Sequence, residues 1–354
     1  MNTVPTGMRV HPHDLERFCI EALSKVGVSE CDARTTAEVL VTTDTWGIFT
    51  HGTKNLRGYI RRIRGGGLGA RATPKVVKEG PAWAMVDGDS ALGMVTSVLA
   101  MRTAIEKARR AGLAYVGVRN SCHFGAAGFY ASLAIAENMI GIAMCNDRPT
   151  VTVPGSRSAV LGSNPLAFAV PAGSERPLLL DMATSTVAGG KVFAATARGE
   201  KIPGHWLVDA NGLPTTDPSL FPASATLTPM AGHKGYGLAL LIETLSGVLT
   251  GAAIAQHVLS WSFDDASLKT GHGAAFIAMD INSIMPVEQF KSRVDQTIRE
   301  IREAPKAKGA DRIYLPGEME WERREKALAE GIDLPEDVAS RLRSLADELG
   351  LKLS

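Results

Sequence analysis

The sequence is poor in cysteine and in aromatic residues, and it has no excess of charge of either sign. Its 354 residues include four cysteines, and 38 basic side chains are balanced by 37 acidic ones. Such a balance gives no electrostatic footprint for nucleic acid or for an anionic membrane. The cysteines form no C-x-x-C pair and no zinc-ligand pattern, so neither a metal site nor a disulfide framework is expected. We expect a small-molecule partner and a reducing, cytoplasmic location.

Long apolar runs are also scarce. Residues 235–255 are apolar over about 20 residues, the length of a membrane span, but Glu243 lies in the middle. A single such segment has no second span to partner its charge. The N-terminal residues lack the apolar core of a signal peptide. We therefore expect residues 235–255 to form a buried helix and expect no contact with a membrane.

The spacing of apolar residues changes along the chain. A period of three or four predicts two helices between residues 14 and 45, with Ser29 or Asp32 as an N-cap, and a third helix over residues 55–64. Residues 75–285 alternate short apolar strands with helices, which favours a layered α/β domain. The chain after Pro286 is helical and charged. We predict an α/β domain at 73–285 and a discontinuous helical domain at 1–72 and 286–354.

A glycine-rich stretch, "RGGGLGA" at 64–70, has the G-x-G-x-x-A spacing of a dinucleotide-binding loop. That loop requires a strand before it and a helix after it, so that the pyrophosphate meets the helix N-terminus. Here a helix precedes the glycines and Pro74 follows them. We interpret the stretch as a linker that ends a helix, and expect no standard Rossmann loop.

The chain contains eight histidines, and most have no convergent polar partners in the sequence. Five are expected to be structural: His11, His13, His205, His257 and His272. Three others lie beside hydroxyl, glycine or charged residues, namely His51, His123 and His233. Only these three are kept as candidates for chemistry.

Thr50 and His51 follow an apolar run and precede Gly52. An imidazole beside a hydroxyl can give a proton to a carbonyl oxygen as hydride arrives. Asp181 ends an apolar strand and could hold the tautomer of that imidazole. The alternatives are that His51 is a cap residue and that Asp181 caps the helix after it. His123 lies between a predicted strand and a predicted helix, where it is a candidate catalytic group. The alternative is that it is only part of a turn.

Two further polar clusters have weaker signals. His233 and Lys234 precede a glycine-rich helix start, where backbone N–H groups and an ammonium could hold a phosphate. Ser163 and Asn164 lie in a turn between two strands. A solvated lysine in a turn is the alternative for Lys234.

Taken in order, these stretches resemble the type 2 malate/L-lactate dehydrogenases, over about residues 12–335. The matching motifs are "THG" (50–52), "SCHFGAAGFYA" (121–131), "LGSNPLAFAVP" (161–171), "LLLDMAT" (178–184), "GGKV" (189–192), "HKGYGLALLIETLSGVLTGA" (233–252) and "YLPGE" (314–318). The resemblance implies a non-Rossmann α/β fold with a mixed sheet and a helical domain built from both termini. It also implies a homodimer that moves hydride between NAD(H) or NADP(H) and a 2-oxo or 2-hydroxy acid, without metal.

The resemblance also implies roles for residues. His51 and His123 compete for the acid/base role, with Thr50 beside His51. Asp181 belongs to the catalytic relay or to the cofactor edge, and Tyr59 contacts substrate. The positions implied for cofactor binding are Asp181, Met182, Ala183, Ser163, Asn164, His233, Lys234 and the turn at Pro316, Gly317 and Glu318.

One departure from the family pattern concerns the substrate. Asn55 stands one helical turn after His51, where many members carry an arginine that can clamp a carboxylate. The substrate is therefore expected to be larger, less charged or held by a different basic group. Asp147 and Arg148 argue in opposite directions about a 2′-phosphate, so NAD and NADP stay open.

Three other functions remain open. The same residue set would suit a reductase of cyclic imine carboxylates such as pyrroline- or piperideine-2-carboxylate. The loss of the arginine at position 55 leaves room for a catalytically silent binding homologue. A hydrolase using Thr50 or Cys122 as nucleophile is disfavoured, because the chain lacks the G-x-S-x-G elbow around "CHFGA".

Overall fold

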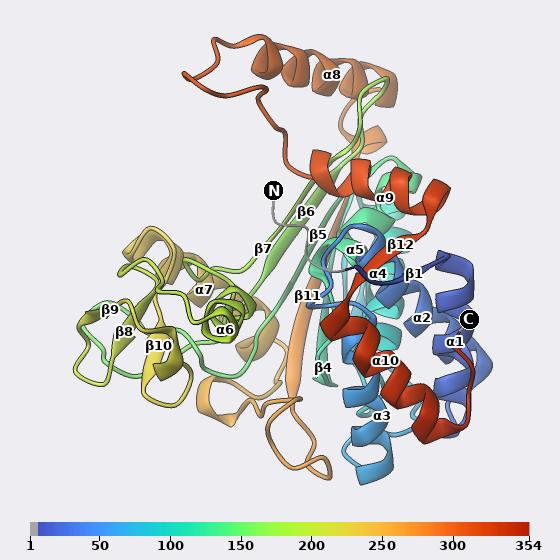
Figure 1. The fold of residues 1–354 in the computed structure, drawn as a ribbon. Coiled ribbons are helices and arrows are strands. Elements are labelled where there is room, and N and C mark those ends of the chain that lie inside the picture. The colour runs from blue at the N-terminus through green and yellow to red at the C-terminus, as the bar shows by residue number, and fades with distance from the viewer. Residues whose placement is uncertain (1–5, 354) are drawn as a thin grey trace.

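A seven-stranded mixed sheet forms the centre of the computed structural model, which describes residues 6–353 (Figure 1). Its strands, in order across the sheet, are β2 (Lys75–Gly80), β3 (Trp83–Asp87), β4 (Leu113–Ser121), β11 (His272–Asp280), β5 (Met139–Cys145), β6 (Leu166–Val170) and β7 (Leu178–Met182). Only β3 and β4 pair in parallel among these described neighbours, and the other pairs are antiparallel. The predicted mixed α/β class is confirmed.

Helices cover both faces of this sheet. They are α1 (Pro12–Ser24), α2 (Glu30–Thr45), α3 (Leu56–Gly65), α4 (Gly93–Ala111), α5 (Ala127–Leu133), α6 (Gly189–Arg198), α7 (His233–Glu243), α8 (Val287–Glu303), α9 (Glu318–Glu330) and α10 (Glu336–Leu349). Figure 1 shows α4 and α5 against one face, with α1 to α3, α9 and α10 on the same side, and α6 and α7 on the opposite side. Buried side chains such as Met101, Val116 and Phe276 join the sheet and α4 in one apolar core.

The segments near the two ends of the chain lie together. Strand β1 (Thr6–Val10) pairs antiparallel with β12 (Ile332–Pro335), and α10 packs beside β1. Helix α8 instead lies near the loop between β6 and β7, where Asp295 accepts hydrogen bonds from the backbone of residues 173–175. The boundaries predicted at residues 72 and 286 stay a prediction, and residues 1–5 of the first segment lie outside the described residues.

Local signals placed the helices of the N-terminal region correctly. Ser29 is the N-cap of α2, and its hydroxyl accepts a hydrogen bond from the Asp32 backbone N–H. Helix α3 ends in Gly66, which has a φ of 90°, a conformation that glycine adopts without steric cost. The interpretation of "RGGGLGA" as a helix-ending linker is therefore confirmed.

The sequence did not predict a small second sheet in residues 207–227. It consists of β10 (Ala225–Leu227), β8 (Leu207–Asp209) and β9 (Pro214–Thr215), and it closes over α6 around a separate apolar cluster that includes Val192 and Leu207. Strands of two or three residues are too short to show alternation, so period alone could not reveal them.

The expectation of one buried helix over residues 235–255 is wrong. The α-helix α7 ends at Glu243 and a single π-helical turn follows at Thr244–Val248. Several large apolar side chains of this segment are exposed: Leu240, Leu241, Val248, Leu249 and Ile254. Nowhere in residues 6–353 is a helix long and apolar enough to cross a membrane.

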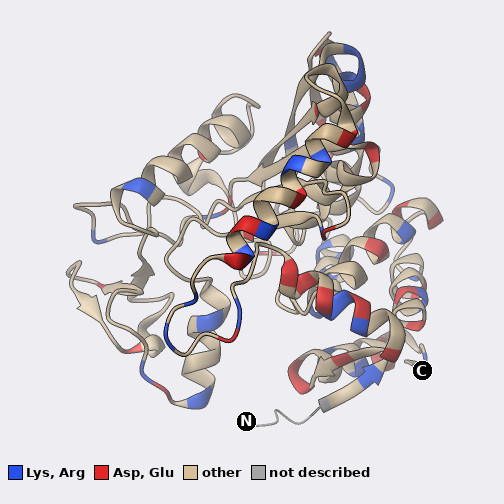
Figure 2. Cartoon of the chain, turned by 90° about the horizontal axis from the view of Figure 1, so that it is seen from above, with Lys and Arg blue, Asp and Glu red and all other residues tan. Residues whose placement is uncertain are grey.

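Charged residues are spread over the molecule. Figure 2 shows basic and acidic residues interspersed along the helices. A few form exposed ion pairs one helical turn apart, such as Arg34 with Glu30 and Arg110 with Glu106. Pairs of this kind contribute about 0.3–0.5 kcal/mol each to helix stability, so the fold depends mainly on its apolar core.

Candidate active site

Seven of the residues predicted for chemistry line one cavity of about 410 Å³, called here the catalytic cavity. They are Thr50, His51, His123, Ser163, Asp181, Met182 and Ala183. They come from segments more than 130 residues apart, which the sheet brings together: His123 follows β4, Ser163 precedes β6 and Asp181 lies in β7. A cavity of this size suits a small molecule.

The other predicted residues lie outside this lining. Asn55 is buried below the turn that carries His51 and donates to the Thr50 carbonyl oxygen (2.9 Å). Asn164 is buried and donates to the Glu243 carboxylate (2.9 Å). His233 and Lys234 are exposed at the start of α7. In the predicted cofactor-binding turn near the C-terminus, Gly317 precedes α9, and Glu318 accepts a hydrogen bond from the Leu315 N–H.

The turn that carries His51 rests on Asp44, a residue that sequence analysis did not single out. The Asp44 Oδ2 atom accepts hydrogen bonds from the backbone N–H (3.1 Å) and the hydroxyl (2.5 Å) of Thr53. A side chain at Gly52 would collide with Asp44 Oδ1, so only glycine allows this approach. Burial, against the hydrogen bonds from Thr53, raises the pKa of Asp44 to about 7.

This carboxyl predicts a pH dependence of stability. An unfolded aspartate has a pKa of about 3.9, so between about pH 4 and pH 7 the unfolded chain loses this proton before the folded one. The stabilisation is complete below pH 4 and is lost as the pH rises through 7. We expect Asp44→Asn, which mimics the neutral carboxyl, to be more stable than the wild type at pH 8 by on the order of 2 kcal/mol.

Thermal unfolding of both proteins at pH 5.5 and pH 8 checks this expectation. The wild type should lose more stability than Asp44→Asn between the two pH values. Asp311→Asn, at an exposed carboxylate, is the matched control and should follow the wild type. Parallel pH profiles of the wild type and Asp44→Asn would contradict the assignment.

His123 is held from two sides. Its Nδ1 atom lies 2.6 Å from the Tyr59 hydroxyl, and its ring stacks on Trp261 with 4.5 Å between centroids. Burial raises the pKa of Tyr59, so the phenol keeps its proton and donates it to Nδ1. The hydrogen of the neutral imidazole is then on Nε2. Burial and the neighbouring His51 lower the pKa of His123 to about 3, so it is neutral at physiological pH.

His51 lies next to His123, with 5.6 Å between the ring centroids. Its Nδ1 atom is 2.9 Å from the Thr50 hydroxyl. Burial lowers the pKa of His51, and the negative charge of Asp147 partly opposes this shift. The two histidines are thus adjacent, both neutral and both on the wall of one cavity.

Asp147 is the carboxylate that acts on both imidazoles, and it pairs with a histidine that we expected to be structural. His272 Nε2 lies 3.2 Å from Asp147 Oδ1, and both residues line the catalytic cavity. Burial raises the pKa of Asp147, but the hydrogen bonds from His272 and from the Arg148 backbone N–H, together with the nearby imidazoles, outweigh it and leave the pKa below its usual value. The structural expectation for His272 is therefore incomplete, because the residue belongs to the cavity wall.

A buried polar network fixes the position of Asp147. Glu243 accepts hydrogen bonds from Asn146 (3.4 Å) and Asn164 (2.9 Å), and Asn164 Oδ1 accepts one from the Asp147 N–H (3.2 Å). Glu243 is the charge that interrupts the apolar run at 235–255. Its function in the fold is to hold the ends of β5 and β6 at the cavity.

Asp181 forms no hydrogen bond or ion pair with His51 in the part of the chain that the structure describes. Its Oδ2 atom accepts a hydrogen bond from the Gly128 N–H (2.7 Å), at the start of α5. Burial raises the pKa of Asp181 to about 6. The expected orientation of His51 by Asp181 is therefore not formed here, because the carboxylate is directed to the helix start.

Arg148 follows Asp147 directly. Among the described residues that line the catalytic cavity, it alone carries a guanidinium or ammonium group. The side chain is half-buried, with its guanidinium carbon 5.5 Å from the centre of the Phe263 ring. This is the group in the cavity that can bind a carboxylate through two parallel hydrogen bonds.

Comparison with known proteins identifies the family. The family model described as malate/L-lactate dehydrogenase matches residues 10–343. The chain belongs to the malate/L-lactate dehydrogenase family. It is 37% identical over 352 residues to a malate dehydrogenase of Pyrococcus abyssi, covering 98% of this chain and 96% of that protein. It is 36% identical over 337 residues to the ureidoglycolate dehydrogenase (NAD(+)) of Escherichia coli, covering 95% of each.

A solved structure agrees over the whole fold. The sulfolactate dehydrogenase of Methanocaldococcus jannaschii superposes with a TM-score of 0.90 at 37% identity, covering 98% of each chain. The predicted malate/L-lactate dehydrogenase family and the expected oxidoreductase class are confirmed by these matches.

Five cavity residues of this malate/L-lactate dehydrogenase family member were missed as site residues from sequence. The sequence relates Asp147 and Arg148 only to the choice of cofactor, predicts a structural role for His272 and indicates no role for Asn146 or Trp261, yet all five line the catalytic cavity. The sequence does hold one signal for three of them, because Asn146, Asp147 and Arg148 directly follow a buried strand end. Polar residues at such ends commonly form sites in α/β proteins.

Proposed function

We propose that the protein is an NAD(P)-dependent dehydrogenase that interconverts a 2-oxo acid and a 2-hydroxy acid. The observation that carries this proposal is the convergence of His51, His123 and Arg148 on one cavity. Two imidazoles can serve the oxygen that changes between carbonyl and alcohol, and one guanidinium can hold the carboxylate beside it. A hydrolase finds no support, since burial raises the pKa of Cys122 and keeps it a thiol.

His51 is assigned the proton transfer. We assign His51 the tautomer with its hydrogen on Nδ1, the atom 2.9 Å from the Thr50 hydroxyl. Its Nε2 then keeps a lone pair and accepts the proton of the substrate hydroxyl during oxidation. The nearby charge of Asp147 stabilises the imidazolium that forms. In the reverse direction the same nitrogen returns the proton to the oxygen. His123, with its hydrogen on Nε2, donates a hydrogen bond to the same oxygen and orients it.

The cavity fits a nicotinamide cofactor, which would supply or accept the hydride when bound. Gly189 and Gly190 at the start of α6 line the cavity, and within residues 6–353 no side chain caps this helix. Backbone N–H groups at a helix start favour an anion. Ser163, Asp181, Met182 and Ala183 would hold the inner part of the cofactor. For its outer part we propose Lys234, His233 and the turn at Gly317 and Glu318.

Cofactor binding tests the proposal directly. We expect NADH or NADPH to bind the purified protein with a micromolar dissociation constant, measured by nucleotide fluorescence and by thermal shift. The rate at which 2-oxo acids such as oxaloacetate, sulfopyruvate and pyruvate oxidise the bound NADH or NADPH then identifies the substrate. Cyclic imine carboxylates are tested in the same way as the rival class. Failure to bind either nucleotide would reject the dehydrogenase function.

We also propose a homodimer in the cytoplasm. Four exposed apolar side chains lie on the continuous helical segment from α7 through the π-helical turn: Leu240, Leu241, Val248 and Leu249. An exposed apolar patch of this kind favours a partner surface, and a two-fold dimer can bury it against itself. All four cysteines are unpaired, which suits a reducing compartment.

The mass in solution tests this assembly. We expect light scattering to give twice the chain mass for the wild type, and the mass of one chain for the variant with both Leu241→Asp and Val248→Asp. The variant Leu213→Asp, at an exposed leucine of the small-sheet region, should stay dimeric. A wild-type protein with the mass of one chain would refute the dimer.

A further inference from the structure

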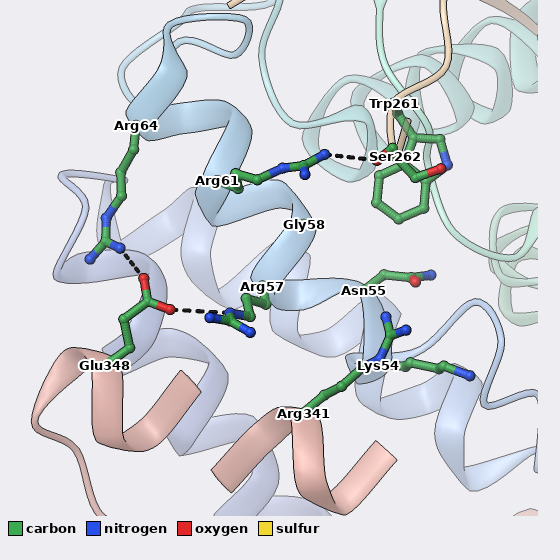
Figure 3. A pocket seen from close by; sticks show the side chains of 10 residues that line it. All are labelled: Lys54, Asn55, Arg57, Gly58, Arg61, Arg64, Trp261, Ser262, Arg341 and Glu348. Carbon is green, nitrogen blue, oxygen red and sulfur yellow. Dashed lines mark hydrogen bonds and ion pairs between the residues drawn. The ribbon is translucent and has the colours of Figure 1, made fainter. Parts of the chain in front are cut away.

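A second cavity, of about 430 Å³, lies between α3 and α10, on the outer side of the turn that carries His51. We call it the basic hollow. Figure 3 shows that its charged side chains come from these two helices and from the short segment before α3. They are Lys54, Arg57, Arg61, Arg64, Arg341 and a single acid, Glu348. Neither the fold nor the proposed dehydrogenase chemistry requires this concentration of positive charge.

The sequence spacing explains how the charges gather. Lys54, Arg57, Arg61 and Arg64 follow one another at intervals of three, four and three residues. Residues at this spacing share one face of a helix, and like charges there destabilise it by a few tenths of a kcal/mol per pair. Three of these cations lie on one face of α3 and Lys54 lies in the short turn before it, with no acid among them, so their repulsion is a cost that an anion would relieve.

The neighbouring acids do not balance these charges. Glu348 is shared between Arg57 (3.1 Å) and Arg64, and Lys54 pairs with Asp337. Arg61 donates to a carbonyl oxygen, that of Ser262 (2.7 Å), and not to a carboxylate. Arg341 has no ion pair within residues 6–353. Five cations thus face two carboxylates, which leaves an excess of three positive charges.

The basic hollow shares a wall with the catalytic cavity. Trp261 and Ser262 line both. A Cβ at Gly58 would lie 2.8 Å from the Trp261 ring, so glycine makes room for the indole against α3. The same indole stacks on His123 and on Tyr59, with ring centroids 4.5 Å and 5.0 Å away. Arg61, through Ser262, holds the loop that places this ring.

We propose that the basic hollow binds a small oxyanion of two or more negative charges, a phosphate compound or a polycarboxylate, as an effector of the dehydrogenase. Guanidinium forks match the oxygen pairs of both groups. An anion here takes hydrogen bonds from Arg61 and Arg341, so the hydrogen bond from Arg61 to Ser262 is exchanged for one to the anion. The loop then loses a tether, and the contact of Trp261 with His123 changes.

Calorimetric titration of the full chain with inorganic pyrophosphate, at fixed ionic strength and with saturating NADH, tests the site. We expect one anion per chain. The double variant Arg61→Gln/Arg341→Gln, at two exposed side chains, should weaken binding at least about ten-fold, the equivalent of one charge-assisted hydrogen bond. Glu348→Gln removes the competing acid and should tighten binding about three-fold or more. A parallel titration with citrate shows which oxyanion class binds more tightly.

Arg110→Gln, on the exposed face of α4, is the matched control and should bind pyrophosphate like the wild type. Absence of heat, or an equal loss in Arg110→Gln, would overturn the proposal, because the effect would then be absent or diffuse. Pyrophosphate binding that is seen without NADH and is absent with saturating NADH would place the anion in the cofactor site and would also overturn the proposal. An unchanged affinity of Glu348→Gln for pyrophosphate would also overturn the proposal.

Tryptophan fluorescence tests the link to the catalytic cavity. Pyrophosphate should change the emission of the wild type and leave the emission of Trp261→Phe unchanged, while the affinity of that variant measured by calorimetry stays within about two-fold, since the guanidinium groups are retained. An unchanged emission of the wild type at saturation would reject the link. Binding to the basic hollow does not require turnover, so its failure and failure of the dehydrogenase function are separate results.

Discussion

Replacing His51 by glutamine is expected to lower kcat by about 10²- to 10⁴-fold, the usual contribution of a general acid or base. The dissociation constant for NADH should change by less than about three-fold, because the amide keeps the volume and hydrogen-bonding capacity of the ring near Thr50. In the oxidation direction, kcat of the wild type should fall as acid protonates His51. Steady-state rates across pH 5 to 9, with a fluorescence titration of NADH, measure all three quantities.

Two variants serve as controls for this expectation. His123→Gln removes a hydrogen bond to the substrate oxygen, so it should raise KM and keep the acidic fall of kcat. His13→Gln, at an exposed imidazole, should behave like the wild type. If His123→Gln abolishes the acidic fall and His51→Gln keeps it, the roles of the two histidines are reversed. Equal loss of turnover and NADH affinity in His51→Gln would show a structural role.

Replacing Arg148 by glutamine should raise KM for the 2-oxo acid by about 30- to 150-fold with a smaller change in kcat. The expected loss is about 2 to 3 kcal/mol, the range for hydrogen bonds to a charged group. Arg148→Lys should recover part of the affinity, because an ammonium keeps the charge but not the two parallel hydrogen bonds. Initial rates over a range of substrate concentrations give both constants.

The carboxylate itself can be tested with a neutral analogue. The methyl ester of the same 2-oxo acid should have nearly the same KM with the wild type and with Arg148→Gln, because it has no charge to bind. Arg157→Gln, at an exposed arginine, is the control for nonspecific charge effects. A KM for the free acid that is unaffected by Arg148→Gln would exclude this arginine as the carboxylate partner.

The sequence predicted the elements more fully than the contacts between them. Short apolar stretches located β2, β3, β4, β5, β6, β7 and β11, and all of these strands except β2 have buried residues on at least one face. The same signal missed β1 and β12 at the ends of the chain. These strands are short and lie directly beside helical segments in the sequence. They are stabilised by pairing with each other across a separation of more than 320 residues.

The site shows the same limit. His51, His123 and Asp181 could be selected because each stands at a change of secondary structure and in a recognisable motif. The pair of Asp147 and His272 is separated by 125 residues, and no local pattern predicts which of several histidines meets a given carboxylate. Asp44 was missed for another reason. It lies in the last turn of α2, and a carboxylate in a helical pattern usually faces solvent.

The antiparallel pairing of β1 with β12 has a consequence for how the molecule is made. The apolar core contains Leu15 and Leu40 near the start of the chain and Leu334 and Leu342 near its end. Synthesis proceeds from the N-terminus at about 5–20 residues per second, so the first helices leave the ribosome well before the strand and helix that cover them. Contacts of such high sequence separation form slowly. The early helices therefore expose apolar surface during translation. Removing β12 and α10 from the C-terminus should leave this surface exposed, so that the shortened protein binds chaperones even where the catalytic residues are all present.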